Sequence, residues 1–305
     1  MQELQLHKLD SMTSMRAQFG EQGHVVHIEN SAAVASLSLF GAHLLSFTPL
    51  CDGRERLWLS ERAIFDGKTP IRGGVPIIWP WFSAHKSIVE APSHGFVRTQ
   101  YWQIDSCREV KDQTGNIADS IISLKPTQIG MHKYPEMLDA KLIINISRQC
   151  TIELITTFKK SNYEQKSCYF SAALHSYFAL ENIHDICIRG IDSPYYDKVN
   201  DSQNNPCPIP YLIDAEVDRV HAIESKADNE RIELYSQSDP NKPVVSIENA
   251  GHNGLVVWNP WKEKSISMAD MPDLGYLKML CIEAAVEPAI ELMPGQSHVL
   301  RQVIK

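Results

Sequence analysis

The amino-acid sequence predicts an all-β protein, built as a large antiparallel β-sandwich (a supersandwich of sheets) with few short helices. Apolar and polar residues alternate in many short runs along the chain. These runs are rich in Val, Ile and Thr and are separated by Gly, Pro, Asn and Asp, a pattern typical of strands joined by turns. Helical periodicity is nearly absent, and without alternating strands and helices a doubly wound parallel sheet is not expected.

The predicted strands extend from the N-terminal region to the last residues. They are HVVHIE (24–29), VASLSLF (34–40), DSIISLK (119–125), KLIINIS (141–147), TIELITTF (151–158), DICIRGI (185–191), PVVSIE (243–248), GLVVW (254–258), LKMLCIEAAV (277–286) and HVLRQVI (298–304). Because such runs occur over nearly the whole length, residues 1–305 are predicted to form a single sandwich domain.

Three segments depart from the strand pattern. ERLWLSERAIF (55–65) is the best candidate for a short helix. Residues 193–216 carry four prolines and several turn formers, which predicts a loop that borders the functional site. Residues 1–19 are interpreted as an N-terminal extension whose structure the sequence does not determine.

Composition excludes several classes of function. The apolar fraction of 43% and the charged fraction of 22% are ordinary for a globular protein. A net charge of −8 without a basic stripe argues against nucleic acid as a partner. Seven cysteines without a CxxC pair indicate free thiols rather than a disulfide framework or a zinc site. No run is long and apolar enough for a signal peptide or a membrane span, so a cytoplasmic protein without membrane contact is predicted.

The stretch TPIRGGVPIIWPWFSAHKSIVEAPSHGFVRTQYW (69–102) concentrates residues that bind ligands. It holds Arg72 and Arg98, two histidines, three tryptophans and a Gly-Gly pair. Arginine binds anions, tryptophan offers a flat apolar wall, and glycine lets a ligand approach the backbone. This combination predicts a site for a small anionic ligand such as a sugar phosphate. Surface ion pairs are the alternative for either arginine taken singly.

Within that stretch, prolines 76 and 80 predict a bent or edge segment rather than a central strand. In HGFVR, an extended backbone would direct His94 and Arg98 to one side, with Phe96 between them. A surface turn with incidental polar groups is the other interpretation. His85, in SAHKS, is interpreted as a solvated loop residue.

Two later runs each carry one residue that suits proton transfer or ligand binding. YFSAALHSYFAL (169–180) is predicted to be a strand with His175 among small residues, where a hydrogen-bonded core histidine is the competing interpretation. AEVDRVHAI (215–223) carries Asp218, for which a solvated or paired carboxylate, with Arg219 as partner, is the simpler interpretation.

Glu283 is the most informative single residue. In LKMLCIEAAV both faces of the predicted strand are apolar, so the carboxylate has no exposed side. Glutamate is rarely buried unless it is paired or functional, and burial raises its pKa toward that of a useful general base. A structural salt bridge is the alternative. Upstream, WNPWKEKSISMADM (258–271) predicts an aromatic wall or corner, or else a core hairpin.

Together, IRGGVPIIWPWF, HGFVRTQYW, AALHSYF, EVDRV, WNPW and LCIEAA resemble the hexose-6-phosphate mutarotases, or glucose-6-phosphate 1-epimerases, within the galactose-mutarotase-like superfamily. The motifs follow the family's order over about residues 20–305. The resemblance implies a supersandwich with the site in an open groove, an isomerase that interconverts the α and β anomers of hexose 6-phosphates, and no metal or organic cofactor. The protein is predicted to be a monomer.

The resemblance also implies roles for the residues that match its motifs. His175 would be the general acid and Glu283 the general base. Substrate would be bound by Arg72 and Arg98 at the phosphate, by Asp218 at sugar hydroxyls, and by His94 near the anomeric end. Ser93 and His221 depart from the family's pattern, which affects substrate preference more than reaction type. A mutarotase of unphosphorylated aldoses and a non-catalytic sugar-binding or regulatory protein are the alternatives.

Overall fold

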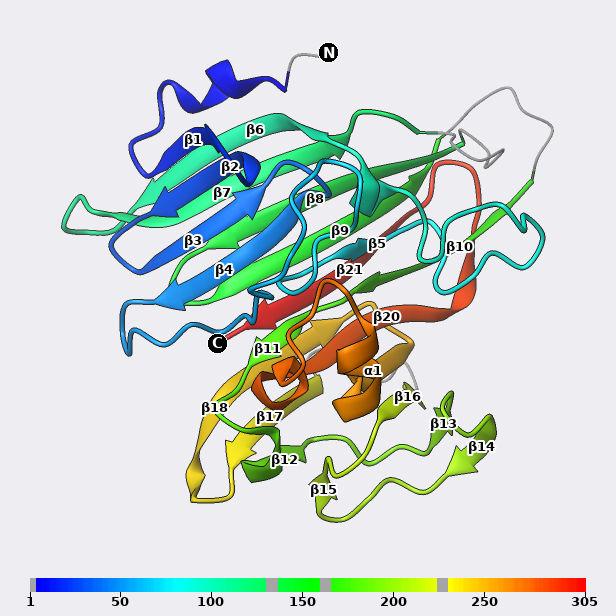
Figure 1. Cartoon of the computed structure of the whole chain (residues 1–305). Helices are drawn as coiled ribbons and strands as arrows, with labels where there is room; N and C mark the ends of the chain where they lie inside the picture. Colours follow the sequence, from blue (N-terminus) through cyan, green and yellow to red (C-terminus); the bar gives the residue numbers. More distant parts are fainter. Residues whose placement is uncertain (1–3, 130–136, 160–165, 224–229) are drawn as a thin grey trace.

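The computed structural model describes residues 4–129, 137–159, 166–223 and 230–305. Within these ranges the chain forms three antiparallel sheets and a single α-helix, α1 (Trp261–Ser267). The prediction of an all-β sandwich is therefore confirmed. Figure 1 shows the N-terminal strands, in blue, lying over the green strands of the middle of the chain, with the last strand, in red, beside the green strands and the orange strands below them.

The first sheet is N-terminal and has the order β1-β2-β3-β4. Its strands are β1 (Met15–Gly20), β2 (Gly23–Glu29), β3 (Ala33–Ser38) and β4 (His43–Pro49), preceded by the 3-10 turn η1 (Leu6–Leu9). Leu37 and Phe47 are fully buried in the large core that this sheet shares with the second. The sequence left the structure of residues 1–19 undetermined; the described part, residues 4–19, contributes η1 and most of the edge strand β1.

The second sheet is the largest, with the order β15-β12-β17-β18-β21-β9-β8-β7-β6. Strands β8 and β9 alternate strictly between buried and half-buried residues, so their apolar side chains fill one face. Its strands are β6 (Trp102–Lys111), β7 (Ile117–Pro126), β8 (Leu138–Ile146), β9 (Cys150–Phe158), β12 (Ile186–Arg189), β15 (Tyr211–Leu212), β17 (Glu230–Ser236), β18 (Asp239–Ala250) and β21 (Ser297–Ile304).

The third sheet positions the candidate site, with the order β14-β13-β16-β19-β20-β10-β5 and β11 paired to β20. Its central strand β20 is buried on both faces over residues 279–286, as its continuous apolar run predicts. The strands are β5 (Ile77–Ile78), β10 (Cys168–Leu174), β11 (Tyr177–Ala179), β13 (Tyr195–Asp197), β14 (Ser202–Asn205), β16 (Val217–Ala222), β19 (Gly254–Asn259) and β20 (Met279–Leu292).

The structure contradicts several predictions of local structure. Residues 55–65 contain no helix, because Leu57 and Leu59 instead form isolated bridges to Phe178 and Gly73. Residues 169–180 are not one strand, since β10 ends at Leu174 and β11 begins at Tyr177.

HGFVR is also not extended. His94 and Gly95 have left-handed backbone conformations, with φ of 67° and 71°, and the 3-10 turn η2 (Val97–Thr99) follows. The bent segment expected from prolines 76 and 80 is confirmed, because β5 is a two-residue strand at the edge of its sheet. Two short turns complete the fold, η3 (Ile183–Asp185) and η4 (Gly275–Lys278).

All seven cysteines are free thiols, as the absence of paired spacing predicts. In the part of the chain that the structure describes, no helix is long and apolar enough to cross a membrane.

Candidate active site

The predicted site residues converge on one cavity of about 340 Å³. This volume lies within the usual range of small-molecule sites, roughly 300–1,000 Å³. The six residues singled out in the sequence all line it, although they come from positions as far apart as 72 and 283. The full lining is Arg72, Phe82, Ser83, His94, Arg98, His175, Lys198, Asp218, Val256, Trp258, Lys264 and Glu283.

Sheet pairing explains why distant residues meet here. Strand β19 lies between β16 and β20, and its register pairs Trp258 with Asp218 and Val256 with Glu283. The two carboxylates therefore flank an apolar strip on the same sheet. His175 follows β10, the neighbour of β20 on its other side.

The buried carboxylate of Glu283 faces the ring of His175. Its Oε1 lies 3.3 Å from His175 Nε2, and the Glu283 side chain is only 2% exposed. Glu283 Oε2 and His175 Nδ1 are buried without a hydrogen-bond partner among the described residues. Buried polar atoms in this state are costly unless a ligand or water satisfies them, which marks the pair as a candidate for chemistry.

The environment keeps both members of the pair close to neutral. Burial raises the pKa of Glu283 well above its usual value, and the nearby carboxylate of Asp218 raises it further. Burial also lowers the pKa of His175 well below its usual value, and His94, Arg98 and Arg72 lower it further. Such a pair carries one proton over a wide pH range, and that proton belongs to the pair rather than to either residue.

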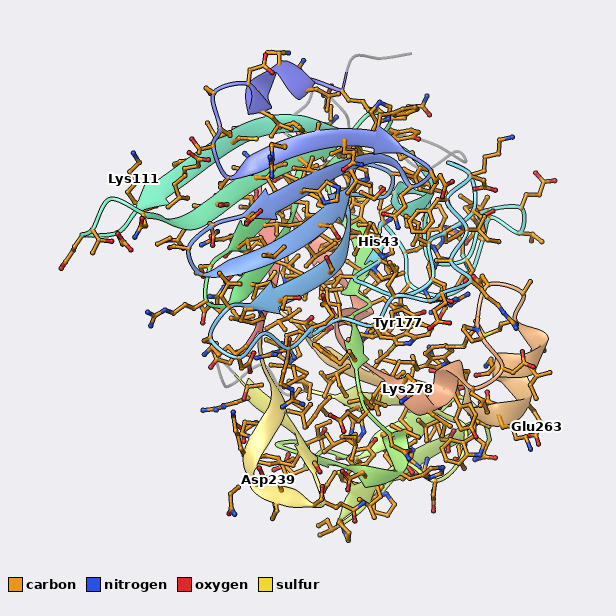
Figure 2. All side chains as sticks on the ribbon, turned by 60° about the vertical axis from the view of Figure 1, so that its left-hand side comes forward. His43, Lys111, Tyr177, Asp239, Glu263 and Lys278 are labelled. Atoms are coloured by element: carbon orange, nitrogen blue, oxygen red, sulfur yellow. The ribbon has the colours of Figure 1, made fainter. Side chains whose placement is uncertain are left out.

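The imidazole of His175 is fixed by its neighbours. It stacks on the ring of Tyr177 at a centroid distance of 4.8 Å and an interplanar angle of 8°, and Trp258 meets it edge-on at 5.9 Å. Its backbone N–H donates to the carbonyl of Pro76 at 3.1 Å, which ties the break between β10 and β11 to the bent segment. Tyr177 and His43 both lie inside the molecule, as Figure 2 shows.

Arg72 is oriented by two partners. Its Nε and Nη2 each lie 3.1 Å from Oδ2 of Asp270, and its Nη1 donates to the hydroxyl of Tyr177 at 2.9 Å. The Asp270 carboxylate neutralises much of its charge before any ligand binds.

Arg98 differs from Arg72 in lacking a carboxylate. Among the described residues it makes no ion pair; its Nη2 donates to the carbonyl of Ser93 at 2.9 Å, and its Nε is buried without a partner. Burial lowers the pKa of Arg98 to about 10, so the guanidinium stays charged at neutral pH. An uncompensated, partly buried guanidinium is a strong anion-binding group.

His94 lines the same cavity, near the ring of His175. Its backbone N–H donates to the carbonyl of Ser83 at 2.8 Å, its Nδ1 accepts from the backbone N–H of Ser83 at 3.3 Å, and its ring is 6.3 Å from that of His175. Burial, followed by the charges of Arg98, Lys198 and Arg72, lowers the pKa of His94 to about 3, so its ring is neutral at neutral pH.

The expected pairing of Asp218 with Arg219 is wrong. Neighbouring residues of a strand point to opposite faces, and Arg219 packs over the ring of Tyr195 at 4.9 Å. Asp218 instead lies 3.6 Å from Nζ of Lys198. Burial raises the pKa of Asp218, while the charge of Lys198 acts to lower it.

The tryptophans of residues 69–102 do not form the wall that the sequence suggested. Trp79, Trp81 and Trp102 are buried in the core, and none of them is among the cavity-lining residues. The aromatic walls are instead Phe82 and Trp258, and the latter confirms the wall predicted for WNPW.

The Gly-Gly pair also serves packing rather than ligand approach. Gly73 has φ of 103°, and a Cβ there would lie 2.4 Å from the carbonyl oxygen of Trp58. Its own carbonyl oxygen lies 2.6 Å from Nε2 of His43, a buried histidine whose pKa burial lowers to about 4. These contacts fix the backbone beside Arg72.

Gly73→Ala is therefore expected to lower the free energy of unfolding by about 3 kcal/mol, because the left-handed backbone and the close carbonyl both oppose a methyl group. Urea denaturation measures the change. Gly115→Ala is the matched control: Gly115 also has positive φ, but none of the described atoms lies within 4 Å of a Cβ built there. An equal loss in both variants would assign the effect to backbone conformation alone.

Several residues of the site were missed by sequence reasoning. Lys198 lies in the loop that was expected to border the site, but nothing in the pattern singled it out. Asp270, which orients Arg72, and His43, which supports Gly73, carry no local signal.

The two departures from the family's pattern lie outside the cavity lining. Ser93 is exposed and contributes its carbonyl to Arg98. His221 is a satisfied core residue that bonds to Tyr211 and to the Ser193 carbonyl. His85 is a half-buried loop residue outside the cavity.

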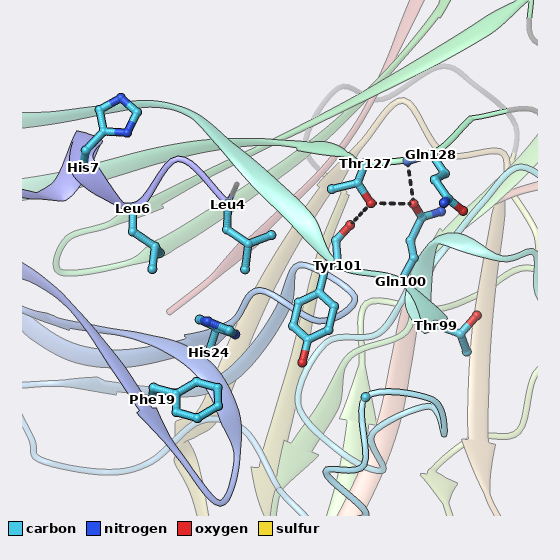
Figure 3. A pocket seen from close by; sticks show the side chains of 11 residues that line it. Leu4, Leu6, His7, Phe19, His24, Thr99, Gln100, Tyr101, Thr127 and Gln128 are labelled. Carbon is cyan, nitrogen blue, oxygen red and sulfur yellow. Dashed lines mark hydrogen bonds between the residues drawn. The ribbon is translucent and has the colours of Figure 1, made fainter. Parts of the chain in front are cut away.

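A larger cavity of about 860 Å³ lies between the N-terminal segment and η2. Figure 3 shows its lining, which includes Leu4, Phe19 and Tyr101, with Thr127 hydrogen-bonded to Gln100 and to the Tyr101 carbonyl. Its described lining contains no carboxylate, lysine or arginine. It therefore lacks the paired acid and base of the smaller cavity, which is the better candidate for chemistry.

An antiparallel supersandwich whose cavity joins a buried carboxylate, an imidazole and arginines defines a class of enzyme that moves protons on a small polar substrate. A family model described as aldose 1-epimerase matches residues 24–305. The chain belongs to the aldose 1-epimerase family, so its activity is that of an epimerase or mutarotase and its substrate class is a sugar.

Named relatives lie within the same family. The chain is 29% identical over 269 residues to a protein of Escherichia coli K12 named "Putative glucose-6-phosphate 1-epimerase", covering 86% of this chain and 82% of the relative. A relative from Cenchrus ciliaris with the same name is 29% identical, with coverage of 86% and 78%.

Solved structures agree with the fold. The crystal structure of a "putative mutarotase" from Salmonella typhimurium has a TM-score of 0.81 at 26% identity, covering 96% of this chain and 94% of that one. The galactose 1-epimerase of Lactobacillus acidophilus NCFM has a TM-score of 0.66 at 15% identity, with coverage of 96% and 98%. The latter likeness concerns the fold alone.

Proposed function

We propose that this protein is a glucose-6-phosphate 1-epimerase, which interconverts the α and β anomers of hexose 6-phosphates. The observation that carries the proposal is the contact of 3.3 Å between Glu283 and His175 in a cavity that also holds the uncompensated guanidinium of Arg98. The names of the relatives at 29% identity support the same substrate.

Anomer exchange requires two proton movements, one at each of the two oxygens bonded to C1. A base removes the proton of the anomeric hydroxyl while an acid protonates the ring oxygen, so that the C1–O5 bond breaks and an aldehyde forms. Rotation about C1–C2 and reclosure then give the other anomer. In the proposal Glu283 is the base, His175 is the acid, and their roles reverse on reclosure, each contributing roughly 10²- to 10⁴-fold.

The single proton of the buried pair suits this exchange. Ring opening needs an ionised Glu283 and a protonated His175. This state holds one proton, as does the neutral pair in which the proton lies on the carboxyl of Glu283, so the two states differ only in where that proton is. A bound phosphate would add negative charge to the site and favour the protonated imidazole. Activity should fall at low pH, where the pair gains a second proton, and at high pH, where it loses the first.

Arg98, Arg72, Asp218 and His94 would bind the substrate. Arg98 is the principal phosphate ligand in this proposal, because Asp270 already compensates Arg72. Asp218 would accept hydrogen bonds from sugar hydroxyls, and the neutral ring of His94 would line the anomeric end. No metal or organic cofactor is proposed. A monomeric state and a cytoplasmic location stay predictions.

The deciding experiment compares α/β exchange of glucose 6-phosphate with that of glucose by NMR exchange spectroscopy. Acceleration of glucose 6-phosphate exchange with a higher kcat/KM than for glucose supports the proposal. Faster exchange of glucose would identify a mutarotase of free aldoses. Saturable binding without exchange of either sugar would identify a sugar-binding or regulatory protein.

Arg98→Met is expected to lower kcat/KM for glucose 6-phosphate by roughly 10²-fold, because a charge-assisted contact to phosphate contributes about 1.5–3 kcal/mol. Exchange of glucose should change much less. The measurement is the ratio of the two kcat/KM values in the variant and the wild type. Arg62→Met, which removes an exposed arginine paired with Asp273 outside the cavity, is the control. An equal loss on both sugars would make Arg98 structural.

A further inference from the structure

Lys198 is a cavity-lining residue that the sequence did not identify. It follows β13, where the carboxylate of Asp197 accepts hydrogen bonds from the backbone N–H groups of Val199 at 2.9 Å and Asn200 at 3.3 Å. Its own backbone N–H donates to the Asp218 carbonyl at 2.9 Å. The backbone is thus anchored on both sides of Lys198, although the neighbouring residues belong to a loop.

The ammonium group has three neighbours inside the cavity. Its Nζ lies 3.6 Å from Asp218 Oδ1, donates to the hydroxyl of Ser83 at 3.4 Å and lies 4.5 Å from the centre of the Phe82 ring. These contacts hold a long, flexible side chain in one position. They also place its charge beside the carboxylate expected to bind sugar hydroxyls.

Lys198 differs from the other cations of the cavity in its partner. Lys264 is paired with Glu216 at 2.8 Å and Arg72 with Asp270 at 3.1 Å, and neither of these carboxylates lines the cavity. Lys198, in contrast, is paired with Asp218, and Asp218 does line the cavity.

The charge of Lys198 also affects the pKa of Glu283, the proposed base. Asp218 raises the pKa of Glu283, whereas Lys198 and Arg98 lower it. Lys198 also acts to lower the raised pKa of Asp218. The titratable and charged groups around Glu283 are His175 after β10, Tyr177 on β11, Asp218 on β16, Lys198 after β13, Arg98 on η2 and Cys281 on its own strand. His94, Arg98 and Arg72 also act on His175, and Lys264 and Glu216 also act on Asp218.

We propose that Lys198 is a positioning residue of the epimerase site: its ammonium holds Asp218 as an ionised acceptor for sugar hydroxyls and sets the charge balance around Glu283 and His175. The inference rests on the proposed function, because it assigns a role within that reaction. It makes Lys198 act through Asp218 and the acid–base pair, so its effect does not depend on the phosphate of the substrate.

The first test is the pH dependence of kcat/KM for Lys198→Met and Lys198→Arg. Removing a positive charge beside both proton-binding groups makes protonation easier, so Lys198→Met should move the whole pH profile to higher pH by about one unit. Lys198→Arg keeps the charge and should leave the profile in place. The control Lys278→Met removes a lysine that lies outside the cavity and bonds to the Glu181 carbonyl.

Two further measurements separate positioning from other roles. The loss of kcat/KM in Lys198→Met should be equal for glucose and glucose 6-phosphate, since both present the same hydroxyls to Asp218. It should also be smaller in an Asp218→Asn background, because coupled residues give non-additive losses. A loss confined to glucose 6-phosphate would instead make Lys198 a phosphate ligand and overturn the proposal. Additive losses, or an unshifted profile in a folded Lys198→Met variant, would overturn it too.

A titration without substrate keeps this test apart from the proposed function. The ¹³C carboxyl signal of Glu283, assigned by its loss in Glu283→Gln, should titrate at higher pH in Lys198→Met than in the wild type. If the wild type shows no sugar exchange but this shift occurs, the epimerase assignment fails while the charge coupling holds. An unchanged titration in a protein that does catalyse exchange would refute the role of Lys198 alone.

Discussion

Glu283→Gln is expected to reduce α/β exchange of glucose 6-phosphate by roughly 10³-fold or more, because an amide cannot accept the proton of the anomeric hydroxyl. The substitution keeps the shape of a side chain that is 2% exposed, so the cavity should persist. NMR exchange spectroscopy measures the rate, and retained binding of glucose 6-phosphate would show that the loss lies in the chemical step.

The same variant should be at least as stable as the wild type at pH 8. Burial raises the pKa of Glu283 above its usual value of 4.5, so the folded state holds a proton that the unfolded chain releases. The contribution of this carboxyl to stability is therefore complete below about pH 4.5 and is lost as the pH rises through the raised pKa. Glutamine has no such dependence, so the stability difference should grow with pH.

Glu287→Gln is the matched control, since Glu287 lies four residues further along β20 and outside the active-site cavity. Its exchange rate should stay close to that of the wild type. Exchange at the wild-type level in Glu283→Gln would remove Glu283 as the base. A folded but unstable Glu283→Gln variant would instead indicate that the carboxylate is structural.

The fold was largely predictable from periodicity, as β8, β9 and β20 illustrate. Strict alternation in β8 and β9 matches a sheet buried on one face, and the unbroken apolar run around Glu283 matches a central strand buried on both. The same logic made Glu283 conspicuous, because a carboxylate within such a run has no route to solvent. Both the alternation of apolar residues and a carboxylate inside an apolar run can be recognised within a short stretch of sequence.

The partners of the site residues were not predictable in the same way. Asp270 neutralises Arg72 and Lys198 faces Asp218, yet each pair is brought together by tertiary packing of distant segments. Residue type alone suggested that Arg72 and Arg98 are equivalent. Their partners make them different, and only Arg98 keeps an uncompensated charge among the described residues.

Residues 69–102 show how composition can suggest the wrong cause. The tryptophans and the Gly-Gly pair were interpreted as contacts for a ligand, but Trp79 fills the core, and Gly73 is required because a Cβ at that position would lie 2.4 Å from a backbone carbonyl oxygen. Close packing of the chain against itself selects the same residue types as close approach of a ligand. The arginines of the stretch do line the cavity. Its composition therefore predicted the charged residues of the site correctly, but not the residues that form its walls.

His175→Ala should lower exchange of glucose 6-phosphate by roughly 10²- to 10⁴-fold, because the ring oxygen loses its proton donor. The imidazole occupies a defined slot, with Tyr177 stacked on one face at 4.8 Å and Trp258 edge-on at 5.9 Å. Removing the ring leaves a space of matching shape beside Glu283. Added imidazole should therefore bind there and restore part of the activity.

The rescue distinguishes proton donation from support of the fold. If His175 donates the proton, substituted imidazoles should restore activity in an order that follows their pKa values, within the size limit set by the slot. His85→Ala, which removes a loop histidine outside the cavity, should keep the wild-type rate and show no response to imidazole. A His175→Ala variant that binds glucose 6-phosphate and keeps wild-type exchange would exclude His175 as the acid. A folded, inactive variant that no imidazole rescues would favour a role for the ring in orienting Glu283 through their 3.3 Å contact.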